Sequence, residues 1–390
     1  QQILFLSPEP PYPLNGGGAL RTASLLHYAA AHADIDLILF AVDGASDPAA
    51  SIPPSLVRNT FAIPLPAHSK HPIPRILRNT SRLLRGVPPL LDRFSGCEPT
   101  LAAFLQNRRY DAAILEHFWS APYHAILKAH ASRLYLNLHN IESEWHLRLG
   151  RQSSWPESLG HQRFAHLYQT AERRHLPHFD AVLVTSAREA GLMNGYRSLV
   201  YPNAIPQAQR PIAQPTDSIV FSGNLEYHPN QQAVAWFARH IWPRIHARLP
   251  NLQWRILGKN PHGIAPIVQH LPNVHLTGPV PHAIPALAQS KIAIVPVLSG
   301  SGTRVKILEA WAAAIPVIST SLGAEGLDAT PGTHYLRADT PEEFIRSITH
   351  LTGNPSQAAQ LGAAGRCIYE QRFTWEAAWS HLVREKFLLP

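Results

Sequence analysis

The sequence predicts an α/β protein with two doubly wound domains, each a parallel sheet covered by helices on both faces. Its 390 residues are about twice what one hydrophobic core supports, so two domains are expected. Short apolar runs without strict alternation are separated by helical patterns, which is typical of sheets buried on both faces. Apolar residues make up 45% of the chain and charged residues only 15%, a composition that excludes general disorder.

The first domain is expected over residues 1–203, where apolar runs and helical patterns alternate. Several prolines end the first apolar run, and Gly16, Gly17 and Gly18 lead into the first helix. Ser186 and Glu189 form a capping box that opens a short helix. The expected strands are 3–6, 35–42, 112–115, 134–138 and 181–185, and the expected helices are 19–31, 123–130 and 157–176.

A second series of the same kind is expected over residues 204–371, because the periodicity is lost between Gln207 and Thr216. The expected strands are 219–222, 254–257, 274–277, 292–295 and 317–320, and the expected helices are 231–248, 284–289, 305–313, 342–351 and 356–369. A last helix, 375–387, belongs to a C-terminal segment, 372–390, that is expected to pack back on the first domain. Open α/β sheets bind ligands outside the carboxyl ends of their strands, so the chemistry is expected there, in a cleft between the two domains.

Charge and cysteine content limit the classes of binding partner and of covalent cross-link that this chain can have. The formal net charge is +8 and the pI is about 9.7, so anionic partners are expected. Nucleic acid is not expected, because the aromatic residues are not interleaved with the basic ones and no binding motif is present. Cys97 and Cys367 lie far apart, which argues against a disulfide framework. No apolar run reaches about 18 residues, and a cytoplasmic protein is expected.

Residues 73–86 predict a basic amphipathic helix. Arginines recur along one side and apolar residues fill the other: Arg75, Arg78, Arg82 and Arg85 against Ile76, Leu77, Leu83 and Leu84. Three interpretations remain open. The arginines contact the anionic inner face of a membrane, they guide a lipid-linked or acidic acceptor, or the helix is an ordinary surface helix with a solvated arginine face.

The glycines at 16–18 follow the first strand and open a helix, where backbone N–H groups can approach an anion. A plain flexible turn is the alternative. Their spacing is not G-x-G-x-x-G and the chain has no G-x-x-x-x-G-K-[ST] segment, so a dinucleotide or P-loop site is poorly supported.

The strongest signal lies in residues 299–309, where a Gly/Ser loop precedes Arg304 and Lys306 at the start of a helix. The helix dipole disfavours cations there, and a bound anion would reverse this effect. A diphosphate is the simplest anion, with arginine as a bidentate donor and lysine as a point charge. The alternative is a solvated pair of Lys306 with Glu309 at i, i+3 spacing. Gly223 and Asn224, at the end of another strand, can present N–H groups to the same anion.

Residues 300–326 resemble the donor-binding region of glycosyltransferase family 4, the retaining group 1 sugar transferases with the GT-B fold. Residues 223–230 are similar to the G-N-L-x-Y-x-P-N motif of bacterial members. The segments 139–142, 202–203 and 373–376 are similar too. The resemblance implies two Rossmann-like domains, of which the first binds the acceptor and the second binds a nucleotide sugar.

The resemblance also implies roles for single residues. Glu309 would hold the nucleotide ribose, and His139 would lie beside the transferred sugar, although a structural histidine remains an alternative in a chain with 23 of them. Arg304 and Lys306 would hold the diphosphate, and Gly17 and Gly18 would close on it from the other domain. From their places after strands, the further predicted donors to the diphosphate are Gly223, Asn224, Ser301, Gly302 and Thr303. The family often has a glutamate where this chain has Ser301, so the donor sugar stays open.

The expected function is transfer of a sugar, with retention of configuration, from a nucleoside diphosphate sugar to a saccharide, lipid-linked or other acceptor hydroxyl, in glycan or glycoconjugate synthesis. Two alternatives remain: a binding protein that kept the fold without catalysis, which Ser301 permits, and a sugar-nucleotide epimerase. No cofactor besides the donor substrate and no metal are expected. Histidines such as His117, His124 and His130 are scattered, and no D-x-D stands in a suitable loop.

Overall fold

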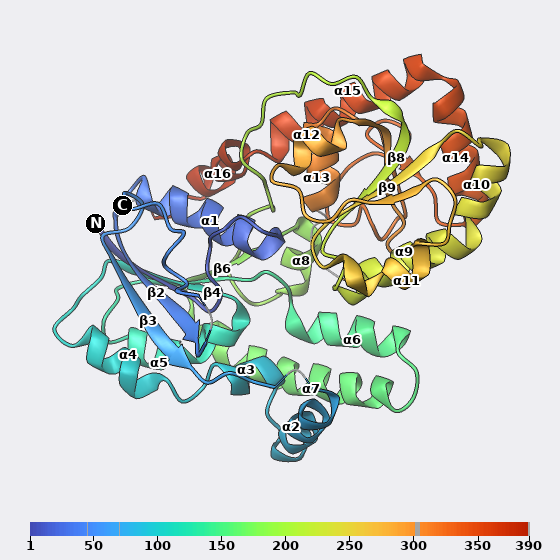
Figure 1. Cartoon of the computed structure of the whole chain (residues 1–390). Coiled ribbons are helices and arrows are strands. Elements are labelled where there is room, and N and C mark those ends of the chain that lie inside the picture. The colour runs from blue at the N-terminus through green and yellow to red at the C-terminus, as the bar shows by residue number, and fades with distance from the viewer. Residues whose placement is uncertain (45, 70, 301–304, 389–390) are drawn as a thin grey trace. The chain divides into compact units, whose positions relative to one another are not determined.

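The computed structural model of the chain describes residues 1–44, 46–69, 71–300 and 305–388. The chain divides into two compact units (Figure 1). Unit 1 comprises Gln1–Asn203 and Trp379–Pro390, and unit 2 comprises Ala204–Ala378. Each unit contains a parallel sheet with helices around it. The predicted α/β class with two doubly wound, Rossmann-like sheets is therefore confirmed.

Unit 1 contains a seven-stranded sheet in the order β3-β2-β1-β4-β5-β6-β7. Its strands are β1 (Gln2–Ser7), β2 (Asp34–Val42), β3 (Asn59–Leu65), β4 (Ala112–Glu116), β5 (Leu134–Asn137), β6 (Ala181–Val184) and β7 (Ser198–Val200). Its α-helices are α1 (Gly17–Ala30), α2 (Pro72–Arg85), α3 (Pro89–Arg93), α4 (Glu98–Leu105), α5 (His124–Leu127), α6 (Glu142–Gln152), α7 (Glu157–His175) and α8 (Ala187–Leu192). Two 3-10 helices, η1 (Phe118–Tyr123) and η2 (Leu176–His178), complete the unit.

The core of unit 1 lies on both faces of this sheet. On one face, alternate residues of the strands pack against α4, α5 and α7, and the members include Leu4, Leu6, Ile38, Leu101, Leu127 and Tyr168. On the other face, α1 contacts the end of the chain. Tyr28 Oη donates to the Phe387 carbonyl at 3.0 Å, and Trp379 Nε1 donates to the Ser24 carbonyl at 3.1 Å. These contacts attach the last residues of the chain to α1.

Unit 2 contains a six-stranded sheet in the order β10-β9-β8-β11-β12-β13. The strands are β8 (Thr216–Ser222), β9 (Gln253–Leu257), β10 (Val274–Leu276), β11 (Ser290–Val295), β12 (Val317–Ser319) and β13 (Leu336–Arg337). The helices are α9 (His228–His240), α10 (Trp242–Arg248), η3 (Pro261–Gly263), α11 (Ala265–Val268), α12 (Ala283–Leu287), α13 (Val305–Ala312), α14 (Pro341–Gly353) and α15 (Pro355–Arg372). The last helix, α16 (Trp375–Arg384), begins in unit 2 and ends in unit 1.

Several predicted elements differ from the structure. The helix expected over 231–248 is two helices, because Pro243 in the first turn of α10 lacks the N–H that a continuous helix needs. The helix expected over 123–130 is a 3-10 segment, η1, followed by the single turn α5. Strand β3 was not expected. It contains Pro64 and has one paired edge only, a position at which proline is tolerated.

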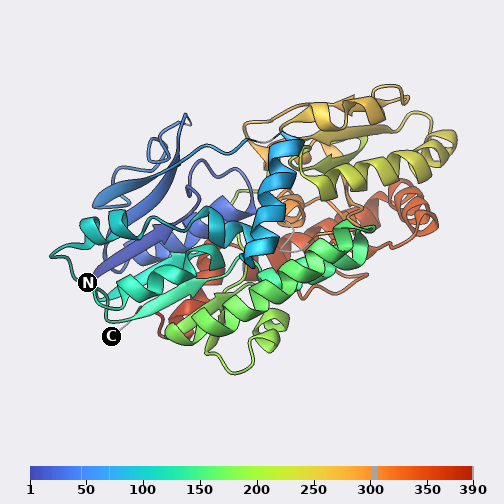
Figure 2. The ribbon, with the colours of Figure 1, turned by 90° about the horizontal axis from the view of Figure 1, so that it is seen from below.

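Helix α2 forms where it was predicted, but it is oriented differently. Arg82 is buried, and its Nε donates to Asp92 Oδ2 at 2.8 Å. The prediction of a solvated arginine face is therefore wrong for this residue. Most of the apolar side chains of α2, namely Ile73, Ile76, Leu77 and Leu84, are exposed instead. In Figure 1 α2 lies below α7, and in Figure 2, seen from below, it lies on the near side, so it forms the outer layer of unit 1 there.

Within the residues that the structure describes, none of the helices is both long and apolar enough to span a bilayer.

Candidate active site

In unit 1, two predicted site residues meet at the carboxyl edge of the sheet. Gly17 and Gly18 are the first two residues of α1, after Gly16, whose φ of 123° suits glycine. His139 follows β5 by two residues and is buried. A Cβ atom added to Gly18 would lie 3.6 Å from His139 Nδ1. The structure therefore brings Gly18 and His139 together.

A buried carboxylate that the sequence reasoning missed holds His139. Glu116 is the last residue of β4, which pairs with β5 so that Glu116 lies beside Asn137. Glu116 Oε2 is 2.7 Å from His139 Nε2, and Thr22 Oγ1 donates to the same oxygen at 3.0 Å. Asn137 Nδ2 donates to both carboxylate oxygens, each at 3.0 Å. The sequence signal for Glu116 was its position directly after the apolar run 112–115, where a polar residue lies at the carboxyl end of a strand.

The orientation of Asn137 is fixed by a buried arginine. Arg21 Nε donates to Asn137 Oδ1 at 2.9 Å, and Arg21 Nη1 donates to the Tyr201 carbonyl at 2.6 Å and to Asn203 Oδ1 at 2.9 Å. Since a guanidinium only donates, the Asn137 oxygen must face Arg21 and the Asn137 amino group must face Glu116. Arg21 thus supplies a positive charge and sets the hydrogen-bond direction.

These contacts assign the protonation states. Burial raises the pKa of Glu116, whereas the Asn137 amide and the Arg21 charge lower it. Because the neighbours of its oxygens are donors, we assign Glu116 as the carboxylate. Burial, with the Arg21 charge, lowers the pKa of His139 well below its ordinary value, so the ring is neutral. Its one proton is then on Nε2, which donates to Glu116, and Nδ1 presents a lone pair on the side of Gly18.

Aromatic rings stack against His139. The His117 ring lies 3.6 Å from the His139 ring and 4.1 Å from the Trp119 ring, centroid to centroid, and Trp119 stacks on Phe94 at 5.6 Å. His117 has a φ of 61°, a backbone conformation that few residues adopt. Burial lowers its pKa well below the ordinary value, so its 3.8 Å approach to Glu9 is not an ion pair. The stack holds His139 from one side.

A second buried carboxyl group lies at the start of α6. Trp119 Nε1 donates to Glu142 Oε1 at 2.9 Å. Burial raises the pKa of Glu142 to about 8, and the nearby Glu172 contributes in the same direction. Glu142 is therefore an uncharged acid at neutral pH.

In unit 2, Lys306 is held at the carboxyl end of β8. Its Nζ donates to Asn230 Oδ1 at 2.7 Å and lies 4.2 Å from the centre of the Phe221 ring. Asn230 Nδ2 donates to the Asn224 carbonyl at 2.7 Å, which fixes the amide so that its oxygen faces the ammonium group. Lys306 is thus a positioned cation, and the Asn224 carbonyl contributes by orienting the Asn230 amide that holds it.

The backbone at Gly223 approaches the same ammonium group. Its φ is 154°, and a Cβ atom there would lie 2.8 Å from Asn230 Nδ2 and 3.2 Å from Lys306 Nζ. Glycine leaves this space open. Glu309, one turn further along α13, is half-buried, and burial raises its pKa to about 7 while Lys306 lowers it. Ser301, Gly302, Thr303 and Arg304 lie outside the described residues.

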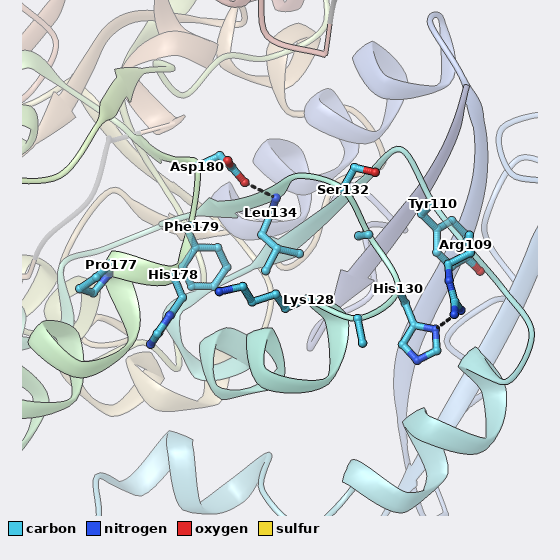
Figure 3. Close-up of a pocket in the computed structure, with 12 residues that line it drawn as sticks. Arg109, Tyr110, Lys128, His130, Ser132, Leu134, Pro177, His178, Phe179 and Asp180 are labelled. Carbon is cyan, nitrogen blue, oxygen red and sulfur yellow. Dashed lines mark hydrogen bonds between the residues drawn. The ribbon is translucent and has the colours of Figure 1, made fainter.

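A depression of roughly 730 Å³ opens elsewhere in unit 1 (Figure 3). Its lining includes Tyr110, Leu134 and Asp180, which precede or begin β4, β5 and β6. Asp180 Oδ2 accepts from the Leu134 N–H at 2.7 Å. The depression is therefore at the amino ends of these strands, opposite to the edge where α/β sheets bind ligands.

In the described part of the chain, no three side chains of the His, Cys, Asp or Glu types are arranged to hold a metal ion.

Comparison with solved structures shows which fold this chain shares. Sucrose-phosphate synthase from Thermosynechococcus elongatus has a TM-score of 0.73 and 18% identity, with 99% of each chain covered. The Anabaena protein HepE, in complex with UDP and glucose, has a TM-score of 0.64 and 15% identity, again with 99% of each chain covered. TarM has a TM-score of 0.68 and 12% identity over 98% of each chain. The shared fold is the two-domain GT-B fold.

Sequence comparison gives the family. An uncharacterized 44.6 kDa protein in the cps region of Klebsiella pneumoniae is 23% identical over 176 residues, which span 43% of this chain and 45% of that protein. The match thus covers less than half the length of this curated relative. A family profile described as glycosyl transferase 4-like domain matches residues 16–203, and one described as glycosyl transferases group 1 matches residues 216–354. With both halves matched in this order, the chain belongs to the group 1 glycosyltransferases.

Proposed function

We propose that this glycosyltransferase moves a sugar from a nucleoside diphosphate sugar to an acceptor hydroxyl, with retention of configuration. The group 1 profile supports transfer, and the HepE structures with UDP, glucose and UDP-glucose show such donors in a protein of the same fold. Retention rests on the resemblance to family 4. In this proposal residues 204–371 bind the donor, residues 1–203 bind the acceptor, and residues 372–390 pack back on the N-terminal domain.

The positioned cation in unit 2 is the observation that carries the proposal. Lys306 Nζ is held by Asn230 beside Gly223, which has no side chain to occupy the adjacent space. A diphosphate oxygen placed there would meet an ammonium group already in position. The leaving diphosphate gains negative charge as the glycosidic bond breaks, so a fixed cation stabilises the transition state more than the ground state.

Neighbouring residues have matching roles in the proposal. Arg304 stands two positions before Lys306 and adds a second cation for the diphosphate, with Ser301, Gly302 and Thr303 as hydrogen-bond donors. Glu309, with its pKa near neutrality, accepts from or donates to the ribose hydroxyls. Because lysine and arginine supply the positive charge, the reaction as proposed needs no metal.

In unit 1, His139 Nδ1 is proposed to accept a hydrogen bond from a hydroxyl of the transferred sugar. The lone pair is on the side of Gly18, where glycine leaves room for a ligand atom. The N–H groups of Gly17 and Gly18, in the first turn of α1, are free of partners within an ideal helix and suit the donor diphosphate. The acceptor is a saccharide, a lipid-linked sugar or another hydroxyl compound.

The test measures nucleoside diphosphate released from a panel of sugar nucleotides with saccharide and lipid-linked acceptors. K306M is expected to lower turnover by about 10², the effect of one preorganised donor. K291M is the matched control, because Lys291 makes an exposed ion pair with Asp217 at the amino end of β11. The turnover of K291M should stay within about twofold of the wild-type turnover, since exposed ion pairs contribute little to stability.

Three outcomes would contradict the proposal. Equal turnover by the K306M and K291M variants would remove the role of Lys306. Donor binding in a thermal-shift assay, where a ligand at about 100 times its Kd adds roughly 2.7 kcal/mol of stability, without release on any acceptor would indicate a binding protein. A changed sugar nucleotide formed without acceptor would indicate an epimerase.

A further inference from the structure

The Glu9 carboxylate lies beside the space that Gly18 leaves open at the candidate site in unit 1. Glu9 follows β1 by two residues, and its side chain is 54% exposed. A Cβ atom on Gly18 would lie 3.5 Å from Glu9 Oε2 and 3.6 Å from His139 Nδ1. Among the described residues, none donates a hydrogen bond to this carboxylate. A carboxylate and a ring nitrogen with a lone pair are both acceptors, so together they suit the hydroxyl groups of a ligand.

The buried ring of His117 is next to this carboxylate. His117 Nε2 is 3.8 Å from Glu9 Oε2, which is beyond hydrogen-bond distance. The His117 side chain is 5% exposed, and Nε2 has no hydrogen-bond partner among the described residues. A buried polar atom in this state destabilises a protein, so it is seldom kept without a use. Because the Glu9 side chain is half exposed, a shift of about 1 Å would give the ring nitrogen its hydrogen bond.

The backbone and two neighbouring rings fix the place of His117. Its φ of 61° and ψ of 147° form a combination that is almost confined to glycine. Its ring stacks on the rings of His139 and Trp119, at centroid distances of 3.6 and 4.1 Å. A residue other than glycine keeps such a conformation only where its surroundings enforce it, and this strain collects at functional sites. The strained backbone and the buried nitrogen together indicate that His117 serves a ligand-binding group, and Glu9 lies within its reach.

We propose that the Glu9 carboxylate binds the hydroxyl group of the acceptor, with His117 as the residue that positions it. The acceptor hydroxyl donates to one carboxylate oxygen, and His117 Nε2 donates to Oε2. This role rests on the proposed transfer reaction and specifies its acceptor as a saccharide or other polyol that is uncharged around the reacting hydroxyl. A phosphate or carboxylate group there would be repelled by Glu9.

A structural role for Glu9 is the alternative. A carboxylate near the first turn of α1 stabilises that helix through the helix dipole. Glu157, an exposed acid in the first turn of α7, has the same kind of position and lies outside the candidate site. E157A is therefore the matched control. A helix-dipole role predicts lower melting temperatures for E9A and E157A and an unchanged acceptor KM for both.

The test measures kcat and the acceptor KM by nucleoside diphosphate release, with a donor and a saccharide that the wild type uses. E9A should raise the acceptor KM at least about 10-fold and leave the donor KM within about twofold, since the lost hydrogen bond is to the acceptor. E9Q should raise the acceptor KM less, because its amide oxygen still accepts from a hydroxyl.

The variant H117F tests the positioning role, because phenylalanine keeps the ring stack and lacks the ring nitrogen. It should raise the acceptor KM about threefold. Added to E9A, it should have no further effect on this KM, because His117 acts through Glu9. If H117F does not fold, H117N replaces it, since asparagine tolerates a positive φ. Circular dichroism and thermal unfolding establish that the variants are folded.

Where transfer is observed, two results would overturn the role of Glu9: an equal acceptor KM for E9A and E157A, or a further increase in KM when H117F is added to E9A. Where no donor is turned over, saturation-transfer NMR with methyl glycosides of neutral hexoses decides. Binding to the wild type that is lost in E9A supports the role of Glu9 and refutes only the transfer reaction. No binding to the wild type, or equal binding to both proteins, refutes the role of Glu9.

Discussion

Replacing Glu116 by glutamine should leave a buried donor without an acceptor beside His139. The Asn137 amide cannot turn, because Arg21 holds its oxygen, so its amino group faces the side chain at position 116. Asn137 Nδ2 lies 3.0 Å from each Glu116 oxygen, so the glutamine amino group meets the Asn137 amino group whichever way the glutamine is turned. With the glutamine oxygen at the Oε2 position, His139 Nε2 and Thr22 Oγ1 keep their acceptor.

The size of the effect follows from the donor that loses its acceptor. A buried donor without an acceptor costs about 1 to 3 kcal/mol, so the free energy of unfolding should fall by this amount in E116Q. We expect kcat to fall as well, because a neutral amide accepts more weakly from His139 Nε2 than the carboxylate does, which makes Nδ1 a weaker acceptor on the side of Gly18.

The assay is urea unfolding and nucleoside diphosphate release, together with nitrogen-15 NMR of the histidine ring, identified by its loss in a His139→Asn variant. T22V is the control, because it removes one donor to the same carboxylate and leaves no donor without an acceptor. It should keep kcat within about threefold. The reasoning is refuted if E116Q keeps the wild-type free energy of unfolding and the wild-type kcat, or if the wild-type ring has its proton on Nδ1.

Two further predictions concern activity and stability. In G18A the new Cβ would make ordinary contacts at 3.5 Å with Glu9 and 3.6 Å with His139, so the protein should fold, while kcat should fall roughly 10-fold because a ligand atom loses space. The control is G160A in α7, where a Cβ atom would meet nothing within 4 Å and kcat should not change. Equal kcat in both variants would argue against a ligand at Gly18. The pKa of Glu142 is raised by burial from 4.5 to about 8, so its contribution to stability is complete below about pH 4.5 and is lost as the pH rises through 8. The free energy of unfolding of E142Q should therefore rise relative to that of the wild type as the pH increases between these values, by up to about 1.4 kcal/mol per pH unit. Urea unfolding at several pH values measures this difference. A difference that does not change with pH would contradict the raised pKa of Glu142.

Much of the fold was predictable because buried parallel strands have a distinctive composition. The apolar runs at 3–6, 112–115 and 134–138 all became strands of one sheet. Elements with a weaker apolar signal were missed. Strand β3 alternates between exposed and buried residues and contains a proline, and α6 is largely polar on one side. Local patterns identify an element only where burial is continuous or periodic.

The sequence also indicated candidate site residues in both units, Gly18 and His139 in unit 1 and Lys306 in unit 2. Glycines after a first strand and a histidine after a later strand are ordinary signals of a ligand edge, and a Cβ atom on Gly18 would lie 3.6 Å from His139 Nδ1. Lys306 was predicted from the disfavoured charge at a helix start. The role of its partner Asn230 was not predicted, and the structure shows that the Asn230 amide oxygen holds the lysine.

By itself the sequence determined most strands, most helices and the residue types suited to an anionic sugar donor, because these follow from local patterns of burial and charge. Only the tertiary structure placed Glu116 beside His139, since that contact depends on which strands pair, and β4 lies between β1 and β5. Tertiary structure also decided which side of α2 faces solvent. Periodicity defines two sides of a helix, but Asp92, in another helix, selects the side that packs on the protein.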